Sequence, residues 1–436
     1  MSRRTLLRSG LGGYLLAPWL SSSVIAAQAG RNNPAGENIP DTGAVAAGLT
    51  SGEIVLGMSA AFSGPSRGLG IELYRGATAY FTEINQRGGV RGRDVVLKTY
   101  DDGYQPDPCV ENTMTLMLQD RVFTLFGYVG TPTVARILPI LKKFQDQKTY
   151  LFFPFTGAQP QREPPYGEFA FNLRASYLQE TAGLVDNFMA LNRRRIAVFY
   201  QADAYGRSGW AGVRKAAKAH GEMIAGEATY KRGTKFSGSM RMQVEILQKA
   251  KPEAVICIGS YAACAAFLRD AVDLGLRVPI ANLSFVGSEN LLKMVKQGRS
   301  DSRRYTDLLV NSQVVPSYHD TSIAAVREYR ELIRQHNPQA PRELLKEEYT
   351  PFPYSFVSLE GFLNAKLMVE LLQRLGDHPQ RSDLESAAFS IKNFDLGIGE
   401  KISFAASRRQ GLQRVYYTIV EDDRFITLDN WEQRFS

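Results

Sequence analysis

Hydroxyl and aromatic side chains follow several of the short apolar runs in this sequence, where they could bind a ligand. Ser63 comes after the first run, Thr131 after the third and Tyr205 after the fifth, while Phe155-Thr156-Gly157 follows the fourth. If these runs are parallel strands, their carboxyl ends meet at one edge, which is where doubly wound sheets bind ligands. Hydroxyl groups there fix a polar group of a ligand, and aromatic rings cover its apolar part. The sequence therefore predicts a small-molecule site built from these loops.

Thr131-Pro132 is the most informative pair in these loops. Threonine is a good helix N-cap and proline is favoured at the first helical position, so we expect a helix to start here. The free N–H groups and positive dipole end of that helix suit a carboxylate or another electronegative group. Capping alone explains the pair equally well, so ligand binding by Thr131 is one of two interpretations.

Tyr205 stands before a glycine and between two predicted elements. Its ring could close over a ligand while its hydroxyl donates a hydrogen bond, although a single tyrosine often serves only to pack. Phe152 and Phe153 are expected to fill the core, and Phe155 is expected to line an apolar wall of the site.

Residue types used in catalysis and metal binding are present without the spacing that those functions need. None of His220, His319, His336 and His378 pairs with another at metal-ligand spacing, and no H-E-x-x-H, G-x-S-x-G or P-loop motif occurs. Asp101-Asp102 could act as paired carboxylates, but at a strand end they more simply cap or bridge loops. We therefore expect no catalytic residue, no metal and no cofactor.

The three cysteines, Cys109, Cys257 and Cys264, are too few and too scattered for a disulfide framework. An odd count leaves at least one thiol outside any intramolecular pair. The favoured interpretation is that all three are small buried residues. A Cys257–Cys264 disulfide is the alternative in an oxidising compartment.

The N-terminus has the pattern of an export signal. Three arginines in the first eight residues precede an apolar stretch at 11–20, and the small residues at 26–29 offer a cleavage site. The apolar stretch is short for a membrane span, which needs roughly 20 apolar residues. Residues 1–29 are therefore predicted to be a signal peptide for export to the periplasm, by the twin-arginine or the ordinary secretory route. Residues 30–50 are predicted to be a flexible leader.

The charge balance argues against nucleic acid as a partner. The chain carries a net charge of +8, and loss of the three signal arginines would leave +5, which is modest for 436 residues. We interpret basic clusters such as Arg193-Arg194-Arg195 as a solvated helix end, and no nucleic-acid-binding motif is present. The length and the hydrophobic fraction of 44% indicate a globular protein of two or more domains.

From Glu53 onward, short apolar runs alternate with longer amphipathic stretches, which predicts parallel sheets covered by helices on both faces. The predicted strands are 54–59, 95–100, 122–127, 150–153, 196–200, 254–258 and 308–314. The predicted helices are 70–87, 106–119, 132–145, 177–191, 206–219, 238–250, 261–274, 324–335, 358–375 and 385–391. Alternating residues between 402 and 428, with a turn at 421–423, predict a C-terminal antiparallel pair.

Five stretches, in their order along the chain, resemble the branched-chain amino-acid-binding family, the periplasmic receptors of ABC importers. They are IVLGMSAAFSGP at 54–65, GATAYFTEINQRGGVRGR at 76–93, Asp101-Asp102, Asp203–Gly206 and Phe285–Ser288, and the resemblance covers roughly residues 51–430. It implies a type I periplasmic binding fold, an α/β class with two doubly wound lobes joined by a three-strand hinge. The crossovers would lie near Arg174, Val315 and Ala405. Lobe 1 would be residues 51–173 plus 316–404, and lobe 2 would be residues 174–315 plus 405–436, closing over a solute by hinge motion.

The resemblance also implies roles for particular residues. In this family the first lobe holds the ligand carboxylate through backbone and hydroxyl groups, and the matching positions here are Thr131 and Phe155-Thr156-Gly157. Tyr205 matches the tyrosine of the second lobe. The implied protein is a monomeric solute-binding protein, not an enzyme, whose partners are a small molecule and an inner-membrane ABC permease. The alternatives are a ligand sensor for a regulatory partner and a periplasmic carrier of a lipid or sterol.

One position departs from the family pattern. Amino-acid binders place an acidic residue for the ligand's amino group shortly after the sixth strand, where this chain has Ser284 or Phe285. Glu289 lies a few residues on and could substitute, or could cap the next helix. A buried ammonium without a counter-charge is costly. A carboxylate, an amide or a larger apolar solute therefore fits better than a zwitterionic α-amino acid, within a class that also includes branched-chain or aromatic amino-acid-like solutes.

Overall fold

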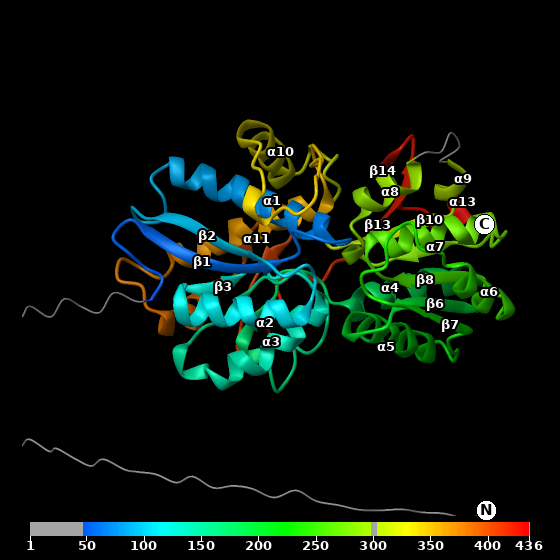
Figure 1. The fold of residues 1–436 in the computed structure, drawn as a ribbon, viewed down its shortest axis with the longest axis horizontal. Helices are drawn as coiled ribbons and strands as arrows, with labels where there is room; N and C mark the ends of the chain where they lie inside the picture. Colours follow the sequence, from blue (N-terminus) through cyan, green and yellow to red (C-terminus); the bar gives the residue numbers. More distant parts are fainter. Residues whose placement is uncertain (1–46, 298–302, 436) are drawn as a thin grey trace, which may run out of the picture. The chain divides into compact units, whose positions relative to one another are not determined.

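The computed structural model describes residues 47–297 and 303–435, and these form two main β-sheets with helices packed around them (Figure 1). The predicted signal peptide, and the predicted leader as far as residue 46, lie outside the described residues. The last leader residues already belong to the fold, because Leu49 is buried and the Val55 N–H donates to the Gly48 carbonyl at 2.8 Å.

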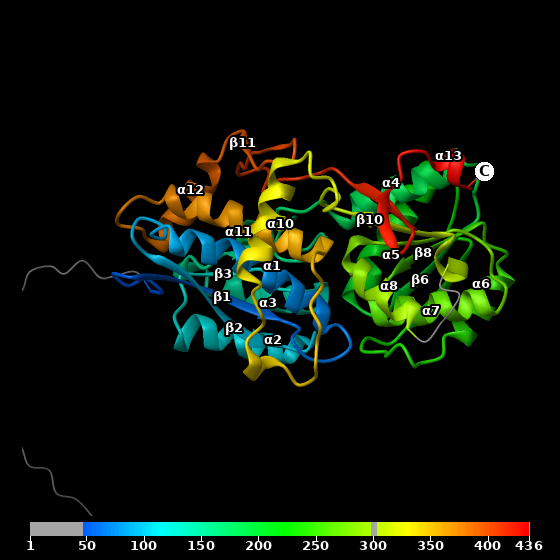
Figure 2. The same ribbon diagram turned by 90° about the horizontal axis from the view of Figure 1, so that it is seen from above.

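The first sheet has five parallel strands in the order β2-β1-β3-β4-β5. They are β1 (Glu53–Ala60), β2 (Asp94–Asp101), β3 (Thr124–Phe126), β4 (Leu151–Phe152) and β5 (Ala170–Phe171). β1 is buried along most of its length, as expected for a strand covered on both faces. Its helices are α1 (Arg67–Gln86), α10 (Ala324–His336) and α11 (Phe356–Gln373) on one side and α2 (Pro106–Met114) and α3 (Thr131–Lys143) on the other (Figures 1 and 2).

The second sheet has seven strands in the order β14-β13-β10-β9-β8-β6-β7. Its parallel strands are β6 (Ile196–Gln201), β7 (Gly226–Tyr230), β8 (Ala254–Ile258), β9 (Ile280–Asn282) and β10 (Leu309–Gln313). β13 (Tyr416–Glu421) pairs antiparallel with β10 and with β14 (Arg424–Thr427). Two groups of helices pack on this sheet: α4 (Tyr177–Ala190) with α5 (Ala204–Ala219), and α7 (Tyr261–Asp273) with α6 (Arg241–Lys249) and α8 (Ser288–Lys296).

The remaining described elements are short. They are α9 (Arg303–Thr306), α12 (Leu384–Ser390), the antiparallel pair β11 (Phe394–Asp395) and β12 (Lys401–Ile402), and α13 (Trp431–Phe435). The predicted helix at 106–119 changes after Met114 into a π-helical segment at Thr115–Gln119.

The doubly wound α/β class and the C-terminal antiparallel pair predicted from the sequence are confirmed. The chain passes from one sheet to the other between β5 and α4, between β10 and α10, and between β12 and β13. These passages contain Arg174, Val315 and Ala405, where the crossovers are predicted. The boundaries of the two lobes stay a prediction.

Two glycines let α1 and α11 pack with their backbones in contact. A Cβ built at Gly76 would lie 1.8 Å from the Ser358 carbonyl oxygen, and one at Gly361 would lie 2.1 Å from the Leu73 carbonyl oxygen. We expect Gly76→Ala to lower the free energy of unfolding by about 3 kcal/mol, because backbone cannot move aside as a flexible side chain can. Urea denaturation measures this change.

The matched control is Gly52→Ala, since a Cβ at Gly52 meets nothing within 4 Å. This variant should stay within about 0.5 kcal/mol of the wild type. If the two alanine variants unfolded at the same urea concentration, the close packing of α1 on α11 would be wrong.

Candidate functional site

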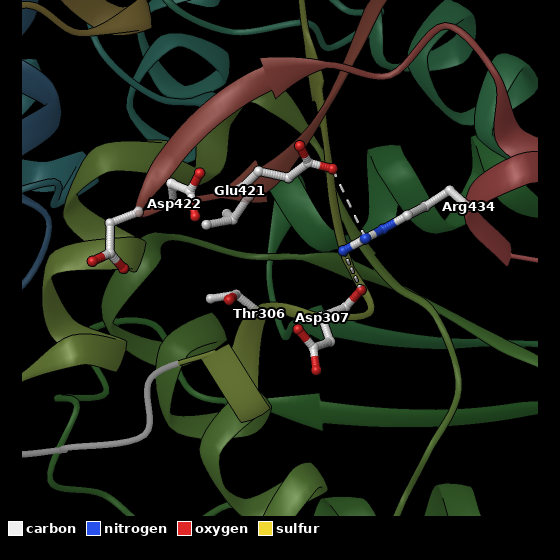
Figure 3. A pocket seen from close by; sticks show the side chains of 7 residues that line it. Thr306, Asp307, Glu421, Asp422 and Arg434 are labelled. Atoms are coloured by element: carbon white, nitrogen blue, oxygen red, sulfur yellow. Dashed lines mark hydrogen bonds and ion pairs between the residues drawn. The ribbon is translucent and has the colours of Figure 1, made fainter.

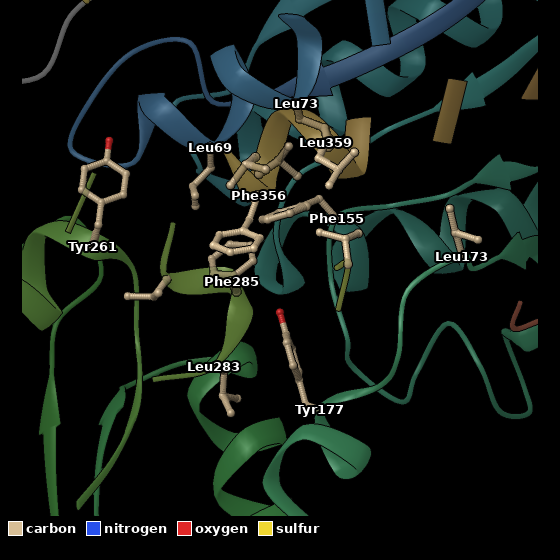
Figure 4. Packing of buried hydrophobic residues seen from close by; sticks show 14 of the residues in the cluster. Leu69, Leu73, Phe155, Leu173, Tyr177, Tyr261, Leu283, Phe285, Phe356 and Leu359 are labelled. Atoms are coloured by element: carbon tan, nitrogen blue, oxygen red, sulfur yellow. The ribbon is translucent and has the colours of Figure 1, made fainter. Parts of the chain in front are cut away.

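Five aromatic side chains from loops and helices of both sheets meet at one place, and Figure 4 shows Phe155, Tyr177 and Phe285 among them. Phe155 follows β4, Tyr104 follows β2, Tyr177 and Tyr205 lie in the first turns of α4 and α5, and Phe285 follows β9. The Phe285 ring centroid lies 4.7 Å from that of Tyr205, 5.4 Å from that of Phe155 and 5.7 Å from that of Tyr104. All five side chains are at most 2% exposed. We call these five residues the aromatic cluster.

The turn after β4 places Phe155 in this cluster. Phe155 N–H donates to the Tyr128 carbonyl at 2.7 Å, and its own carbonyl accepts from Gly130 N–H at 3.1 Å, which ties the turn to the loop before α3. Gly157 makes room for Tyr177, because a Cβ at Gly157 would lie 2.5 Å from the tyrosine ring. Only glycine therefore fits this position without displacing a member of the aromatic cluster.

The prediction that Thr131 caps its helix is wrong. Gly130 is the N-cap of α3, with φ of 103°, and Thr131 is already the first helical residue. A positive φ favours glycine, which explains why Gly130 takes this place. The Thr131 hydroxyl instead lies 2.7 Å from the Thr156 hydroxyl, and both side chains are buried. The two predicted binding threonines are thus brought together beside Phe155.

The hydroxyls of Tyr177 and Tyr205 are buried without a hydrogen-bond partner among the described residues. The two rings lie 5.1 Å apart. Asp203, the N-cap of α5, holds the start of that helix by accepting from Tyr205 N–H at 3.0 Å. Buried polar groups without partners are rare in folded proteins and indicate a functional site or an absent ligand.

A carboxylate does lie at Ser284, although it does not come from the chain segment near that serine. Glu180 of α4 accepts from Ser284 N–H at 2.7 Å, from the Ser284 hydroxyl at 3.0 Å and from the Ser312 hydroxyl at 2.6 Å. As expected, no acidic residue stands at this position of the sequence. The expectation that the site lacks an acidic side chain there is nevertheless wrong, because Glu180 reaches it from α4.

Arg174 joins this carboxylate to the aromatic cluster. Its side chain is 1% exposed, donates from Nη2 to the Ser284 hydroxyl and lies 3.8 Å from Glu180 Oε1. Its Nε lies 3.6 Å from Oε1 of Glu360 on α11, and the guanidinium carbon lies 4.5 Å from the Phe155 ring centroid. We call Arg174, Glu180 and Glu360 the charged cluster.

The electrostatics of the charged cluster follow from its burial. Burial raises the pKa of Glu360 to about 7, although Arg174 opposes this rise. Burial would lower the pKa of Arg174, but Glu360 and other neighbours hold it above its ordinary value, so the guanidinium stays charged. Arg162 donates to the Arg174 carbonyl at 3.2 Å and brings a second positive charge to the edge of the cluster.

Ser63 and the acidic pair Asp101-Asp102 form hydrogen bonds with one another and with loops of the first sheet. The Ser63 hydroxyl donates to Asp101 Oδ2 at 2.5 Å, and Asp101 Oδ1 also accepts from the N–H groups of Phe62 and Ser63. Asp102 accepts from the Ser59 hydroxyl and from Tyr104 N–H, each at 2.8 Å. Asp101-Asp102 thus bridges loops, as we expected, and Ser63 is bonded to this pair rather than to the aromatic cluster.

Glu289 is also bonded elsewhere. Its Oε1 accepts from Phe356 N–H, the first residue of α11, at 3.1 Å. Glu289 therefore bonds to the start of α11 beside the first sheet, and also to its own backbone N–H in the first turn of α8. The contact joins the two sides of the molecule, as do the bonds from Ser66 to Ser260 and from Gly68 N–H to Tyr261.

Arg174, Tyr177, Glu180 and Glu360 were not predicted as site residues. The sequence does contain a sign of Glu180 and Glu360, because both stand at apolar positions of their helix patterns. Glu180 stands on the buried face of α4 with Tyr177, Thr181 and Leu184, and Glu360 lies within the almost wholly buried α11. A charged residue at a core-facing position of a helix indicates a buried partner, which sequence alone does not identify.

A polar hollow of about 600 Å³ lies apart from the aromatic cluster, at the turn between β13 and β14 (Figure 3). Arg434 spans it, donating to the Asp307 carbonyl at 2.8 Å and lying 4.0 Å from Glu421 Oε1. None of the predicted site residues lines this hollow.

The described residues offer no group of three or more histidine, cysteine or acidic side chains that could hold a metal ion. His220 pairs with Asp186 at 2.6 Å and His336 with Glu83 at 2.9 Å. Cys109, Cys257 and Cys264 are buried free thiols, so the disulfide alternative is wrong and the small-buried-residue interpretation is confirmed. Within the described part of the chain, no helix is both long enough and apolar enough to cross a membrane.

A family model described as "Periplasmic binding protein" matches residues 53–424. Among curated proteins, the chain is 25% identical over 226 residues to the Leu/Ile/Val-binding protein homolog 3 of Brucella melitensis. This match covers 52% of the chain and 59% of the relative, which is less than two thirds of that protein's length.

Solved structures extend the likeness over most of the chain. The structure of "a possible leucine/isoleucine/valine-binding protein" from Rhodopirellula baltica SH 1 is 30% identical with a TM-score of 0.78, and the match covers 88% of this chain and 98% of that one. A fatty acid ABC transporter substrate-binding protein from Thermomonospora curvata is 20% identical with a TM-score of 0.74, covering 89% and 94%. At 20% identity this second likeness shows the shared fold alone.

Proposed function

Because this chain belongs to the periplasmic binding protein family, of the type I, branched-chain amino-acid-binding kind, we propose that it captures a small solute between its two sheets. The solute would bind where the aromatic cluster and the charged cluster meet. Opening would separate the loops of the first sheet from those of the second, and closure would bring them together around the solute.

One observation carries this proposal. Phe155 from the first sheet's side touches Phe285 from the second, at a ring separation of 5.4 Å, and buried hydroxyls without partners lie beside them. Unpartnered buried polar atoms also occur elsewhere among the described residues, for example at Thr149 and Trp210, but here they lie together beside aromatic rings, as ligand-binding groups do. Entry of a solute requires the two sides to separate, because the side chains of the aromatic cluster are almost fully buried.

The proposed partner is an inner-membrane ABC permease that receives the solute, and the protein would act as a periplasmic monomer without catalysing a reaction. Export by the predicted signal peptide would deliver it there. The related structures carry names for branched-chain amino acids and for a fatty acid, so the fold alone leaves the ligand open. A sensor that passes closure to a regulatory protein would use the same site, and finding importer genes or regulator genes beside this one separates the two.

A thermal-shift screen of the mature protein tests solute capture. We expect a solute among amino acids, organic acids, amides and sterols to raise the melting temperature, because a ligand at 100 times its Kd stabilises the folded state by about 2.7 kcal/mol. The Phe285→Ala variant should lose most of this rise, since it removes the ring at the centre of the aromatic cluster.

The control is Met223→Ala, at a side chain that is 84% exposed, which should respond as the wild type does. A solute that stabilises the wild type and Phe285→Ala equally would place binding outside the aromatic cluster and contradict the proposed site.

A further inference from the structure

We propose that the solute carries an apolar body and a carboxylate, and that this carboxylate binds the Arg174 guanidinium together with the Tyr205 and Tyr177 hydroxyls. This inference rests on the proposed function, because it names the solute class for the same site. It assigns Arg174 as the residue that determines specificity.

Nη1 and Nε of Arg174 are buried and have no hydrogen-bond partner among the described residues. A guanidinium only donates hydrogen bonds, so an acceptor alone can satisfy these atoms. Arginine also matches a carboxylate with two parallel N–H···O bonds, which are stronger than bonds between neutral groups.

The tyrosines add further donors at the same place. Among the described residues the Tyr205 hydroxyl makes no hydrogen bond, and its ring lies 5.1 Å from that of Tyr177. The Tyr177 oxygen lies within reach of the Thr156 hydroxyl and the Gly157 N–H, which would donate to it, so its own O–H stays available to donate. Figure 4 shows the Tyr177 hydroxyl directed from α4 toward Phe285 and Phe155. The groups at the aromatic cluster are therefore two hydroxyls, which can donate, and a guanidinium, which can only donate.

Glu180, the carboxylate beside Ser284, already accepts three hydrogen bonds, which argues against a ligand ammonium at this carboxylate. Glu180 accepts from the Ser284 N–H, the Ser284 hydroxyl and the Ser312 hydroxyl, and it lies beside Arg174. An ammonium at Glu180 would have to displace these donors or approach the positive guanidinium. Glu360 offers a second carboxylate 3.6 Å from Arg174 Nε. Nη1 of Arg174 and the Tyr205 hydroxyl still make no hydrogen bond among the described residues, and a ligand carboxylate would supply acceptors for them.

Charge balance gives the inference a second, independent consequence. Glu360 from α11 faces Arg174 at 3.6 Å, Glu180 from α4 faces it at 3.8 Å, and Arg162 lies beside its backbone. A bound carboxylate would add negative charge next to Glu360, whose pKa burial already raises to about 7. Binding should therefore take up a proton near neutral pH, and affinity should fall as the pH rises above 7.

The rings of the aromatic cluster suit the apolar part of such a solute. Phe155 and Phe285 offer faces without polar atoms, and Tyr104 lies 5.7 Å from Phe285 with its hydroxyl accepting from Gln201 at 3.2 Å. An aliphatic or aromatic body between these rings keeps water away from the guanidinium and strengthens its bonds to the carboxylate.

Isothermal titration calorimetry with matched probes tests the inference. 4-Methylpentanoate, leucine and 3-methylbutylamine share one branched chain and differ in carrying the carboxylate, both charged groups or the ammonium, and 3-phenylpropanoate and octanoate vary the apolar body. We expect at least one of the three carboxylates to bind. Where 4-methylpentanoate binds, it should do so at least tenfold more tightly than leucine, and the amine should not bind. Proton uptake should appear as a dependence of the heat on the ionisation enthalpy of the buffer.

Conservative variants separate binding from folding. Tyr205→Phe and Tyr177→Phe should each weaken carboxylate binding by about tenfold, as loss of one hydrogen bond to a charged group does. The unliganded melting temperature of Tyr205→Phe should stay unchanged, because the Tyr205 hydroxyl makes no hydrogen bond among the described residues. Arg174→Lys keeps the charge but loses the paired bonds, and should weaken binding more than either tyrosine variant.

Tyr318→Phe is the matched control, since Tyr318 lines a separate groove with Glu289 and Phe352, and it should bind carboxylates as the wild type does. Tighter binding of leucine or of the amine overturns the inference, as does carboxylate binding that all three variants at Arg174, Tyr177 and Tyr205 leave unchanged. Failure of every carboxylate also overturns it. If amines, amides or amino acids bind instead, the proposed solute capture still holds and only the carboxylate inference is wrong. If nothing in the thermal-shift panel binds, both are wrong.

Discussion

Arg174→Gln is expected to lower the free energy of unfolding of the unliganded protein by about 3–5 kcal/mol at pH 8. The substitution leaves the carboxylates of Glu180 and Glu360, which are 0% and 3% exposed, without their positive neighbour. Removal of one partner from a buried ion pair is strongly destabilising, because the remaining charge is neither solvated nor paired. Urea denaturation at pH 8 measures the loss.

A second variant shows whether the loss comes from charge. Arg174→Gln/Glu360→Gln removes one positive and one negative group, and should recover much of the stability that the single variant loses. Arg374→Gln is the surface control, because its pair with Glu370 is partly exposed and is worth about 1 kcal/mol or less. If the double variant were as unstable as Arg174→Gln, lost packing would explain the effect and the charged cluster would not.

Most of the fold could be predicted from periodicity. Long apolar runs such as that of β8 (Ala254–Ile258) and amphipathic stretches such as that of α10 carry their own signal, because burial on both faces or on one stripe fixes which residues are apolar. The strands that were missed lack that signal. β5 has two residues and β9 has three, while β7 alternates buried and exposed residues at the edge of its sheet and includes Glu227.

The candidate site could be predicted in part. Phe155, Tyr205 and Phe285 come together as expected. Tyr205 and Phe285 follow strands of the second sheet, whose carboxyl-end loops face the same side, and Phe155 meets them from the loop after β4 of the first sheet. The partners of Ser284 could not be predicted. Glu180 is 104 residues away along the chain and reaches Ser284 only because α4 packs beside the loop after β9. A helix pattern shows that Glu180 faces inward, but only the tertiary fold shows what it faces.

The second large effect concerns pH. Burial raises the pKa of Asp102, Glu289 and Glu360 to about 7 in each case. An acid with a raised folded pKa holds a proton in the folded protein that the unfolded chain has already released between its ordinary pKa and about 7. Stability from these groups is therefore fully present below the ordinary pKa of about 4 and is lost as the pH rises to 7 and above.

Glu289→Gln isolates one of these groups. Its amide can still accept from Phe356 N–H, as Oε1 of Glu289 does at 3.1 Å, but it cannot ionise. A shift from 4.5 to about 7 corresponds to about 3 kcal/mol. We therefore expect the stability of Glu289→Gln relative to the wild type to increase by about 2–3 kcal/mol between pH 5 and pH 8.5, measured by urea denaturation at both values.

An exposed glutamate as a control, together with the pH dependence of the gain itself, shows whether the gain comes from the buried carboxyl group. Glu245→Gln removes a glutamate that is 54% exposed on α6, and its small effect should be the same at both pH values. Burial is the largest cause of the raised pKa of Glu289, with the neighbouring Glu72 adding to it. A gain for Glu289→Gln that did not change between pH 5 and pH 8.5 would mean that Glu289 is ionised throughout this range. The bond to Phe356 and the start of α11 would then hold a charged carboxylate across the contact between the two sheets.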